Sequence, residues 1–280
     1  MTIRKVSKKH LEITKIIGAT LPLEIHKNVA GVAATEMLNK LGEIDFGFEI
    51  SIEKRIRAGS GVGSSAASSA GAVFGINELL GRPFSKEELI VFAMEGERES
   101  SGSPHADNVA PAILGGFTLV RDNAPIDVIK LPTPKDLYAT IIHPELEICT
   151  KASRSILKNN VPFTTSIRQG ANLAAFVSAL YTSDYKLMSR SLLDLIVEPE
   201  RSALIPKFEQ VKDMALLSGA LGSGISGSGP SIYAISKGEK IAKEVGKKMG
   251  EVYSDVGFKF DLYISPICPN GVKVLATSDK

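Results

Sequence analysis

The sequence predicts an α+β fold built from two domains, and three observations carry this prediction. Its 280 residues are enough for one large domain or two of ordinary size. Segments with the apolar spacing of helices are mixed with alternating, strand-like segments in both halves. A polar run with two prolines, residues 131–136, is the best candidate for a boundary. We therefore expect domains over residues 1–134 and 135–280.

Composition and charge exclude several classes of protein. The chain is 44% hydrophobic, and its net charge of +2 gives no reason to expect nucleic acid or a membrane surface as a partner. No apolar run approaches the roughly 20 residues that cross a bilayer. Cys149 and Cys268 have no metal-like spacing and are too few for a disulfide scaffold. We expect a cytoplasmic protein.

The first elements follow from the spacing of apolar residues. The pattern predicts strands over residues 11–17 and 46–52 and helices over 28–41 and 64–80. Asn28 can cap its helix, and Gly42 suits the end of that helix. Gly81 suits the left-handed position that follows the second helix.

The next helix carries a carboxylate on its apolar side. Ser85 and Glu88 form a capping box that starts this helix. Glu97 lies on the same stripe as Leu89 and Ala93, so it faces inward. Because a bare buried carboxylate is costly, we favour a metal ion or a positive charge as its partner. The alternative is a glutamate at a fraying helix end, close to water.

The remaining elements indicate an antiparallel sheet with helices. The pattern predicts strands over residues 117–120, 137–143, 231–235, 258–264 and 272–276, and helices over 166–181, 184–195, 203–217 and 239–252. Thr150 is placed to cap one further helix, which carries Arg154.

A glycine-rich stretch joins the second predicted strand to the helix over 64–80. It reads Gly59-Ser60-Gly61-Val62-Gly63-Ser64-Ser65. Glycines allow a tight backbone path, and a helix start offers unpaired N–H groups and a positive dipole end. This combination suits a phosphate group. A plain turn with serine caps is the alternative, since isolated glycine motifs give false positives.

Two further groups of polar residues suit ligand recognition. His105, Asp107 and Asn108 lie together in a loop, where such groups commonly bind ligands, although Asp107 alone could cap the segment after it. Arg154 and Arg201 lie near element ends and could grip a carboxylate with two parallel bonds. Solvation at the surface is the alternative for either arginine.

A second glycine cluster, residues 219–230, matches a dinucleotide fingerprint only in its letters. It lies between a helix and a strand with no βαβ unit after it, so we reject NAD as a cofactor.

Motifs of several other enzyme classes have no match in the sequence: the P-loop, the nucleophile elbow and the protein-kinase motifs. A serine hydroxyl at the start of a helix and an inward carboxylate such as that of Glu97 would form half of a Mg²⁺ site. Phosphoryl transfer depends chiefly on positioning and charge neutralisation, so it needs little else.

These motifs together resemble the homoserine kinase family. That family belongs to the superfamily of galactokinase, homoserine kinase, mevalonate kinase and phosphomevalonate kinase. The resemblance covers nearly the whole chain from Asn28 onward. It rests on the stretches over residues 59–68, 96–97, 105–116 and 225–231, of which His-Ala-Asp-Asn-Val-Ala-Pro from His105 is the most specific.

The resemblance implies ATP-dependent phosphorylation of the L-homoserine hydroxyl to O-phospho-L-homoserine, on the way to threonine, and it admits a homodimer. Two alternatives stay open: a homologue that binds nucleotide without turnover, and another small-molecule kinase of the superfamily. The implied roles are ATP phosphate binding by Gly59 to Ser65, Mg²⁺ binding by Ser65 and Glu97, and homoserine binding by His105, Asp107, Asn108, Arg154, Arg201 and Gly227, with Thr150 near the reacting hydroxyl.

The implied fold is an N-terminal domain like domain 2 of ribosomal protein S5 and a ferredoxin-like C-terminal domain. Two departures from the family pattern occur. A motif like Pro-Ala-Ser-Ser-Ala-Asn-Val-Gly-x-Gly-Phe-Asp has no counterpart here, so we expect a shortened N-terminal domain. Arg57 replaces the usual proline before the glycine loop, and it lies either near nucleotide or in solvent.

Overall fold

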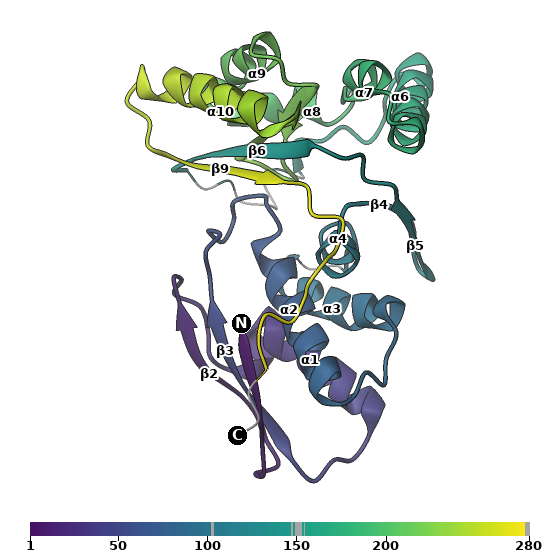
Figure 1. The fold of residues 1–280 in the computed structure, drawn as a ribbon, viewed down its shortest axis with the longest axis vertical. Helices are drawn as coiled ribbons and strands as arrows, with labels where there is room; N and C mark the ends of the chain where they lie inside the picture. The colour runs from purple at the N-terminus through teal and green to yellow at the C-terminus, as the bar shows by residue number, and fades with distance from the viewer. Residues whose placement is uncertain (102–103, 147, 149–152, 154, 278–280) are drawn as a thin grey trace. The chain divides into compact units, whose positions relative to one another are not determined.

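A computed structural model describes residues 1–280 apart from 102–103, 147, 149–152, 154 and 278–280 (Figure 1). The chain divides into two units. The first contains Met1–Ala58, Gly63–Lys130 and the tail from Cys268, and the second contains Gly59–Val62 and Leu131–Ile267. The glycine loop is therefore divided between the two units. The predicted domains over residues 1–134 and 135–280 stay a prediction.

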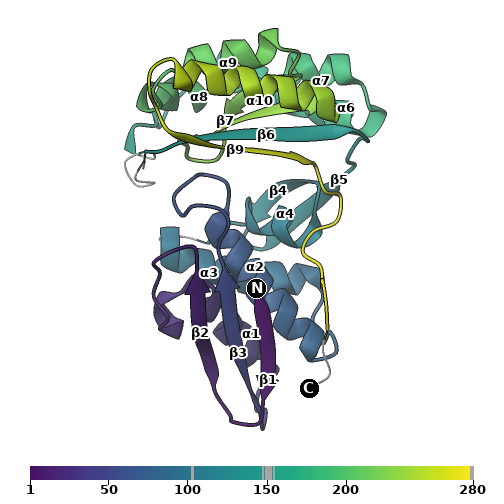
Figure 2. The ribbon, with the colours of Figure 1, turned by 60° about the vertical axis from the view of Figure 1, so that its left-hand side comes forward.

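The first unit contains a three-stranded sheet centred on β3 (Gly47–Glu53), which Figure 2 shows between its neighbours. Strand β2 (Leu11–Ile17) runs parallel to β3, and β1 (Thr2–Val6) runs antiparallel to it. Strand β1 was not predicted, because only Ile3 and Val6 of its five residues are partly buried. Its place is secured by pairing with β3 and by Ile3, which packs against Gly75.

Four helices complete the core of the first unit: α1 (Val29–Leu41), α2 (Ser64–Leu79), α3 (Lys86–Ser101) and α4 (Val109–Leu114). Phe48 and Ile50 of β3 are fully buried beneath them. Gly96 of α3 permits a close approach between helices. A Cβ there would lie 2.4 Å from the carbonyl oxygen of Val29 and 2.5 Å from Ser69 Oγ. This contact brings the end of α3 close to α1 and α2.

The predicted helix caps are confirmed. Asn28 Oδ1 accepts a bond of 3.0 Å from the Ala30 N–H. The Glu88 N–H donates to Ser85 Oγ at 3.2 Å, and the Ser85 N–H donates to a Glu88 carboxylate oxygen at 2.8 Å. Gly81 follows α2 with a φ of 79°. These short-range signals therefore place three helix ends correctly.

A two-stranded sheet of β4 (Phe117–Asn123) and β5 (Ile126–Leu131) ends the first unit. Strand β4 extends beyond the predicted residues 117–120, and β5 was not predicted. The strand predicted over 272–276 is wrong. That segment is irregular and is tied to the first unit by the Val272 N–H, which donates to the Ala112 carbonyl oxygen at 2.8 Å.

The second unit contains an antiparallel sheet in the order β7-β8-β6-β9. The strands are β6 (Leu137–Pro144), β7 (Gly222–Ile225), β8 (Ile232–Lys237) and β9 (Phe260–Pro266). Two helices pack with this sheet, α9 (Phe208–Leu217) between β6 and β7 in sequence and α10 (Glu239–Ser254) between β8 and β9. This strand order and alternation form the expected ferredoxin-like arrangement.

The second unit also contains α6 (Phe163–Thr182), α7 (Tyr185–Ser191), α8 (Glu198–Arg201) and the short 3₁₀ turn η2 (Ser202–Leu204). The prediction of one helix over 203–217 is wrong, because Pro206 lacks an N–H and its predecessor Ile205 is extended. Helix α7 is shorter than predicted. Of the helix predicted after Thr150, most residues lie outside the described ones. Among the described residues, no helix is both long and apolar enough to span a bilayer.

Candidate active site

The glycine loop has the backbone that its sequence predicts. Gly59, Gly61 and Gly63 have φ angles of 73°, 77° and 71°, a region that favours glycine. Gly63 directly precedes α2, so the loop ends at a helix N-terminus. The first N–H groups of α2 have no partner within their own helix, which is the general basis of anion binding at such ends.

The serines of this loop have different partners. Ser64 Oγ donates to the Ile56 carbonyl oxygen at 2.9 Å, and the residue at the N-cap of α2 is Gly63, which has no side chain to cap the helix. The serine caps expected in the alternative interpretation are therefore not formed, while phosphate binding by this loop stays a prediction. Ser60 is 2% exposed, and its Oγ has no hydrogen-bond partner among the described residues. Ser65 Oγ donates to Glu97 Oε1 at 2.7 Å.

Glu97 is a largely buried carboxylate rather than a group at a frayed helix end. The pKa of Glu97 is raised, and the largest cause is burial. In decreasing order of size, the Ser65 hydrogen bond lowers this pKa, the charge of Asp107 raises it, and the charge of Lys54 lowers it. The predicted positive neighbour of Glu97 thus exists in the first unit.

Lys54 is a residue that sequence reasoning missed. It directly follows β3, and its Nζ donates to the Ser64 carbonyl oxygen at 2.5 Å and to Ser68 Oγ at 2.8 Å. Burial lowers the pKa of Lys54, and the charge of Glu97 opposes that shift. The only sequence signal was a lysine between a buried strand and a glycine loop. Lys54 holds the first turn of α2 in place beside Glu97.

The loop from His105 to Asn108 lies at the same place in the first unit. A Cβ on Gly63 would lie 3.1 Å from Asn108 Oδ1, so the Asn108 side chain covers the start of α2. Asp107 is exposed, accepts a bond from the Asn108 N–H at 3.0 Å, and acts on Glu97 through its charge. His105 is half-buried. The fold therefore brings together residues from three separate predicted motifs.

Arg201 lies at the end of α8 in the second unit. Its Nε donates to the Ser153 carbonyl oxygen and its Nη1 to that of Gly227, both at 3.1 Å. These bonds use two of the five guanidinium N–H groups. Arg201 is therefore not a merely solvated residue. Thr150 and Arg154 lie outside the described residues.

The second glycine cluster supports the tip of the first glycine loop, within the second unit. Ser226 Oγ donates to the Gly61 carbonyl oxygen at 2.9 Å. A Cβ on Gly61 would lie 2.4 Å from the Ser226 carbonyl oxygen, so only glycine fits there. Strand β7 lies inside this cluster, where the sequence predicts no strand.

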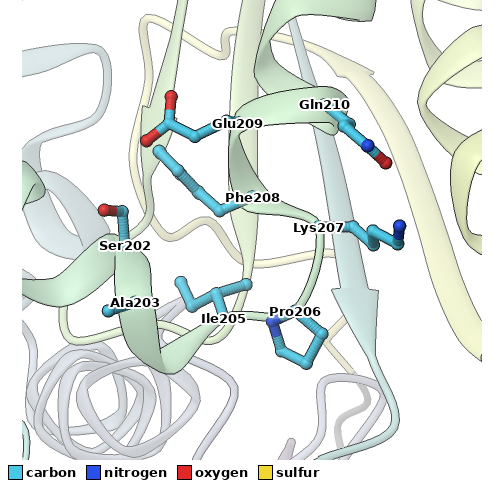
Figure 3. A pocket seen from close by; sticks show the side chains of 8 residues that line it. All are labelled: Ser202, Ala203, Ile205, Pro206, Lys207, Phe208, Glu209 and Gln210. Atoms are coloured by element: carbon cyan, nitrogen blue, oxygen red, sulfur yellow. The ribbon is translucent and has the colours of Figure 1, made fainter.

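A pocket of about 420 Å³ opens in the second unit, directly after Arg201 in the chain (Figure 3). It is lined by Ser202, Ala203, Ile205, Pro206, Lys207, Phe208, Glu209 and Gln210. None of the predicted site residues lines this pocket. Among the described residues, no group of three or more His, Cys, Asp or Glu side chains could form a metal site. A Mg²⁺ ion that keeps water and phosphate ligands needs only one or two protein oxygens.

Comparison with protein families matches both halves of the chain. The model described as GHMP kinases N terminal domain matches residues 27–116, and the one described as GHMP kinases C terminal matches residues 176–255. The first match covers the glycine loop, Glu97 and the loop around Asn108. The second covers Arg201 and the second glycine cluster.

Comparison with individual relatives shows which family of GHMP kinases the chain resembles. A homoserine kinase of Chlorobium phaeobacteroides is 45% identical, over 92% of this chain and 83% of its own. The crystal structure of a homoserine kinase from Cytophaga hutchinsonii has a TM-score of 0.91 at 45% identity, over 96% of this chain and 86% of its own. An L. major mevalonate kinase, at 16% identity over 95% of this chain and 85% of its own and a TM-score of 0.70, shares the fold alone. The chain belongs to the homoserine kinase family of the GHMP kinases.

Proposed function

We propose that this protein is a kinase that transfers the terminal phosphoryl group of ATP to the side-chain hydroxyl of L-homoserine. The products are O-phospho-L-homoserine and ADP. One observation carries the proposal: in a chain 45% identical to a homoserine kinase, the Ser65 hydroxyl at the start of α2 donates a hydrogen bond of 2.7 Å to the half-buried Glu97 carboxylate. The alternatives of a homologue without turnover and of another acceptor alcohol have no observation in their favour.

Ser65 and Glu97 fit a Mg²⁺ ion. Both offer oxygen atoms, which Mg²⁺ prefers, and they lie 2.7 Å apart at the end of the glycine loop. Bound Mg²⁺ would neutralise charge on the transferring phosphate. Glu97 would remain ionised to hold the ion, and Lys54 favours this ionised state by lowering the Glu97 pKa.

The loop from Gly59 through Ser60, Gly61, Val62, Gly63 and Ser64 to Ser65 would bind the ATP phosphates through its backbone N–H groups. Its conformation fits this role, since three glycines with positive φ leave the backbone uncovered by side chains. The buried Ser60 Oγ, which lacks a partner among the described residues, offers a further donor. Ser226 would keep the loop tip in this conformation through its bond to Gly61.

Six residues would recognise homoserine. Asn108 and Asp107 would bind its polar groups with His105 beside them, and Asn108 is supported by its position against Gly63. Arg201 would bind the carboxylate, and its two bonds to backbone carbonyls would orient the guanidinium. Arg154 and Gly227 complete the six by resemblance, and Thr150 would lie near the reacting hydroxyl. The reaction would serve threonine biosynthesis, in the cytoplasm.

A coupled ADP-release assay tests the proposed function. Purified protein receives ATP, Mg²⁺ and either L-homoserine, L-serine or mevalonate. We expect rapid turnover with homoserine and, with either of the others, a kcat/KM lower by a factor on the order of 10² or more, since buried polar groups would lose their partners. Phosphorus NMR should show a phosphate monoester on the side-chain oxygen. Measurable ATP binding without turnover on any acceptor would contradict the proposal.

A further inference from the structure

His143 is a buried histidine to which the proposed reaction gives no role. It is the last residue but one of β6, and it is 4% exposed. Its Nδ1 and the hydroxyl of Ser231 share a hydrogen bond of 3.1 Å, and Ser231 is fully buried. The two residues face each other because β6 pairs with β8 through Ile142 and Ile232, and the next step of this register brings them together. A buried polar side chain needs such a partner, and here the partner belongs to a loop.

Ser231 is the last residue of a turn over residues 226–231, which we call the supporting turn. The Ser226 N–H donates to the Ser231 carbonyl oxygen at 2.8 Å, which closes the supporting turn. Within it, the Gly229 N–H donates to the Ser226 carbonyl oxygen at 2.9 Å. His143 therefore bonds to the side chain of the residue whose main chain closes the supporting turn.

The supporting turn encloses Gly61 of the first glycine loop, and all of these residues belong to the second unit. Ser226 Oγ donates to the Gly61 carbonyl oxygen at 2.9 Å. A Cβ on Gly61 would lie 2.4 Å from the Ser226 carbonyl oxygen and 2.8 Å from that of Gly229. A Cβ on Gly227 would lie 2.8 Å from the Gly61 carbonyl oxygen. Because the two backbones are this close, Gly61 cannot shift unless the supporting turn shifts with it.

Different side chains hold the middle and the end of the supporting turn. In the middle, Ser153 Oγ donates to the Ser228 carbonyl oxygen at 3.0 Å, and Arg201 Nη1 donates to that of Gly227 at 3.1 Å. At the end, the bond is the one that His143 shares with Ser231. Strand β6 lies between β8 and β9, so this bond connects the supporting turn to the interior of the four-stranded sheet.

We propose that His143 is a positioning residue for the nucleotide, which fixes Gly61 through Ser231 and the supporting turn. Its effect passes through hydrogen bonds of the second unit. The inference rests on the proposed role of the first glycine loop in binding the ATP phosphates. A loop that is already held in its bound conformation loses less freedom when the ligand binds, so it binds more tightly. Loss of His143 should therefore weaken ATP binding, while the bond between Ser65 and Glu97 in the first unit stays intact.

Titration of the full chain with a non-hydrolysable ATP analogue and Mg²⁺ measures nucleotide affinity without an acceptor or turnover. His143→Leu and Ser231→Ala should each raise the dissociation constant about five- to tenfold, the effect of one lost hydrogen bond. The double variant should match either single variant within about twofold, because all three lack the same bond. His143→Asn keeps a polar atom near the place of Nδ1 and should recover most of the affinity. Ser226→Ala should raise the dissociation constant at least as far, because it removes the bond to Gly61 itself.

Two buried hydroxyls on the same strands provide matched controls. Thr140→Val on β6 removes a bond of 3.1 Å to the Ala242 carbonyl oxygen, and Ser236→Ala on β8 removes a hydroxyl that has no partner among the described residues. Both variants should keep the nucleotide dissociation constant within about twofold, although Thr140→Val should lower the Tm. An equal rise in Thr140→Val, or no rise in either His143→Leu or Ser226→Ala, would overturn the proposal.

Steady-state kinetics provide a second readout. In His143→Leu, the KM for ATP should rise with the dissociation constant, while kcat at saturating ATP and homoserine should stay within about twofold of the wild-type value. A lower kcat with an unchanged KM for ATP would contradict a role in positioning the nucleotide. A wild-type chain that binds the analogue but phosphorylates no acceptor would contradict the proposed function and leave the titration valid. A wild-type chain that does not bind the analogue would contradict the role of the glycine loop itself.

Discussion

Two inward-facing glutamates, half-buried Glu97 in the first unit and buried Glu198 in the second, differ in the groups that compensate their charge. Burial is the main cause that raises the pKa of both. Glu198 forms a direct ion pair with Lys212. Glu97 accepts a bond from the Ser65 hydroxyl, while the nearby Lys54 donates to the Ser64 carbonyl and Ser68.

This difference separates a structural charge from one suited to a ligand. The carboxylate of Glu198 also lies against Gly224, and together with burial it raises the pKa of Tyr233 to about 12. Lys212 already neutralises Glu198, so that carboxylate has little to offer a further cation. The described partners of Glu97 include the Ser65 hydroxyl and, through its charge, Lys54. Bound Mg²⁺ would add charge neutralisation at this carboxylate.

The strongest test of this contrast is Glu97→Gln. We expect phosphoryl transfer to fall on the order of 10²–10³-fold at saturating Mg²⁺ and ATP, because the ion loses its charged ligand. Glu95→Gln, two residues earlier on the same helix and in an exposed pair with Arg98, is the control and should keep its rate. An unchanged rate in Glu97→Gln would exclude the proposed role.

The same variant has a predicted effect on stability. The folded-state pKa of Glu97 is raised, so its contribution is full below the ordinary value of 4.5 and is lost as the pH rises through the folded pKa. Glutamine has no such loss. Urea unfolding at neutral pH should show a gain in the range of roughly 0.5–2 kcal/mol, which shrinks toward pH 4. A gain independent of pH would contradict this explanation.

The next test removes the partner of Glu198. Lys212→Met should lower the free energy of unfolding by about 3 kcal/mol, because it leaves a buried carboxylate unpaired. Lys243→Met breaks an ion pair whose lysine is 66% exposed, and it should change the free energy of unfolding far less than Lys212→Met does. Adding Glu198→Gln to Lys212→Met should recover part of the loss. Equal costs for the two lysines would remove the distinction drawn between the glutamates.

The smallest expected effect is that of Lys54→Met. The charge of Lys54 lowers the Glu97 pKa, so removing this charge should move the acid limb of the kcat/KM profile to higher pH. The maximal value of kcat/KM should fall about tenfold. Lys54→Arg keeps the charge and should restore the limb. A limb at the same pH in Lys54→Met would mean that this lysine does not act through Glu97.

Short-range signals predicted much of the fold but failed where an element depends on its partner. The caps at Asn28 and Ser85 act within four residues, and both were predicted correctly. Strand β1 has three exposed residues out of five, and β7 reads Gly-Ser-Gly-Ile, so neither has a strand pattern of its own. They are strands because β3 and β8 supply their hydrogen bonds. Pro206 is a helix breaker that can be recognised in the sequence, but the apolar periodicity of residues 203–217 favours one continuous helix.

The sequence by itself determined the glycine loop, its following helix and the inward direction of Glu97. Helical periodicity and glycine backbone freedom act over a few residues, so they need no knowledge of the rest of the chain. Only the tertiary structure decided what Glu97 meets. Ser65 lies 32 positions away in sequence, and its bond to Glu97 exists because Gly96 lets α3 approach α2 closely. Packing also brings Lys54 and Asn108 to the start of α2, and no local sequence pattern encodes this proximity.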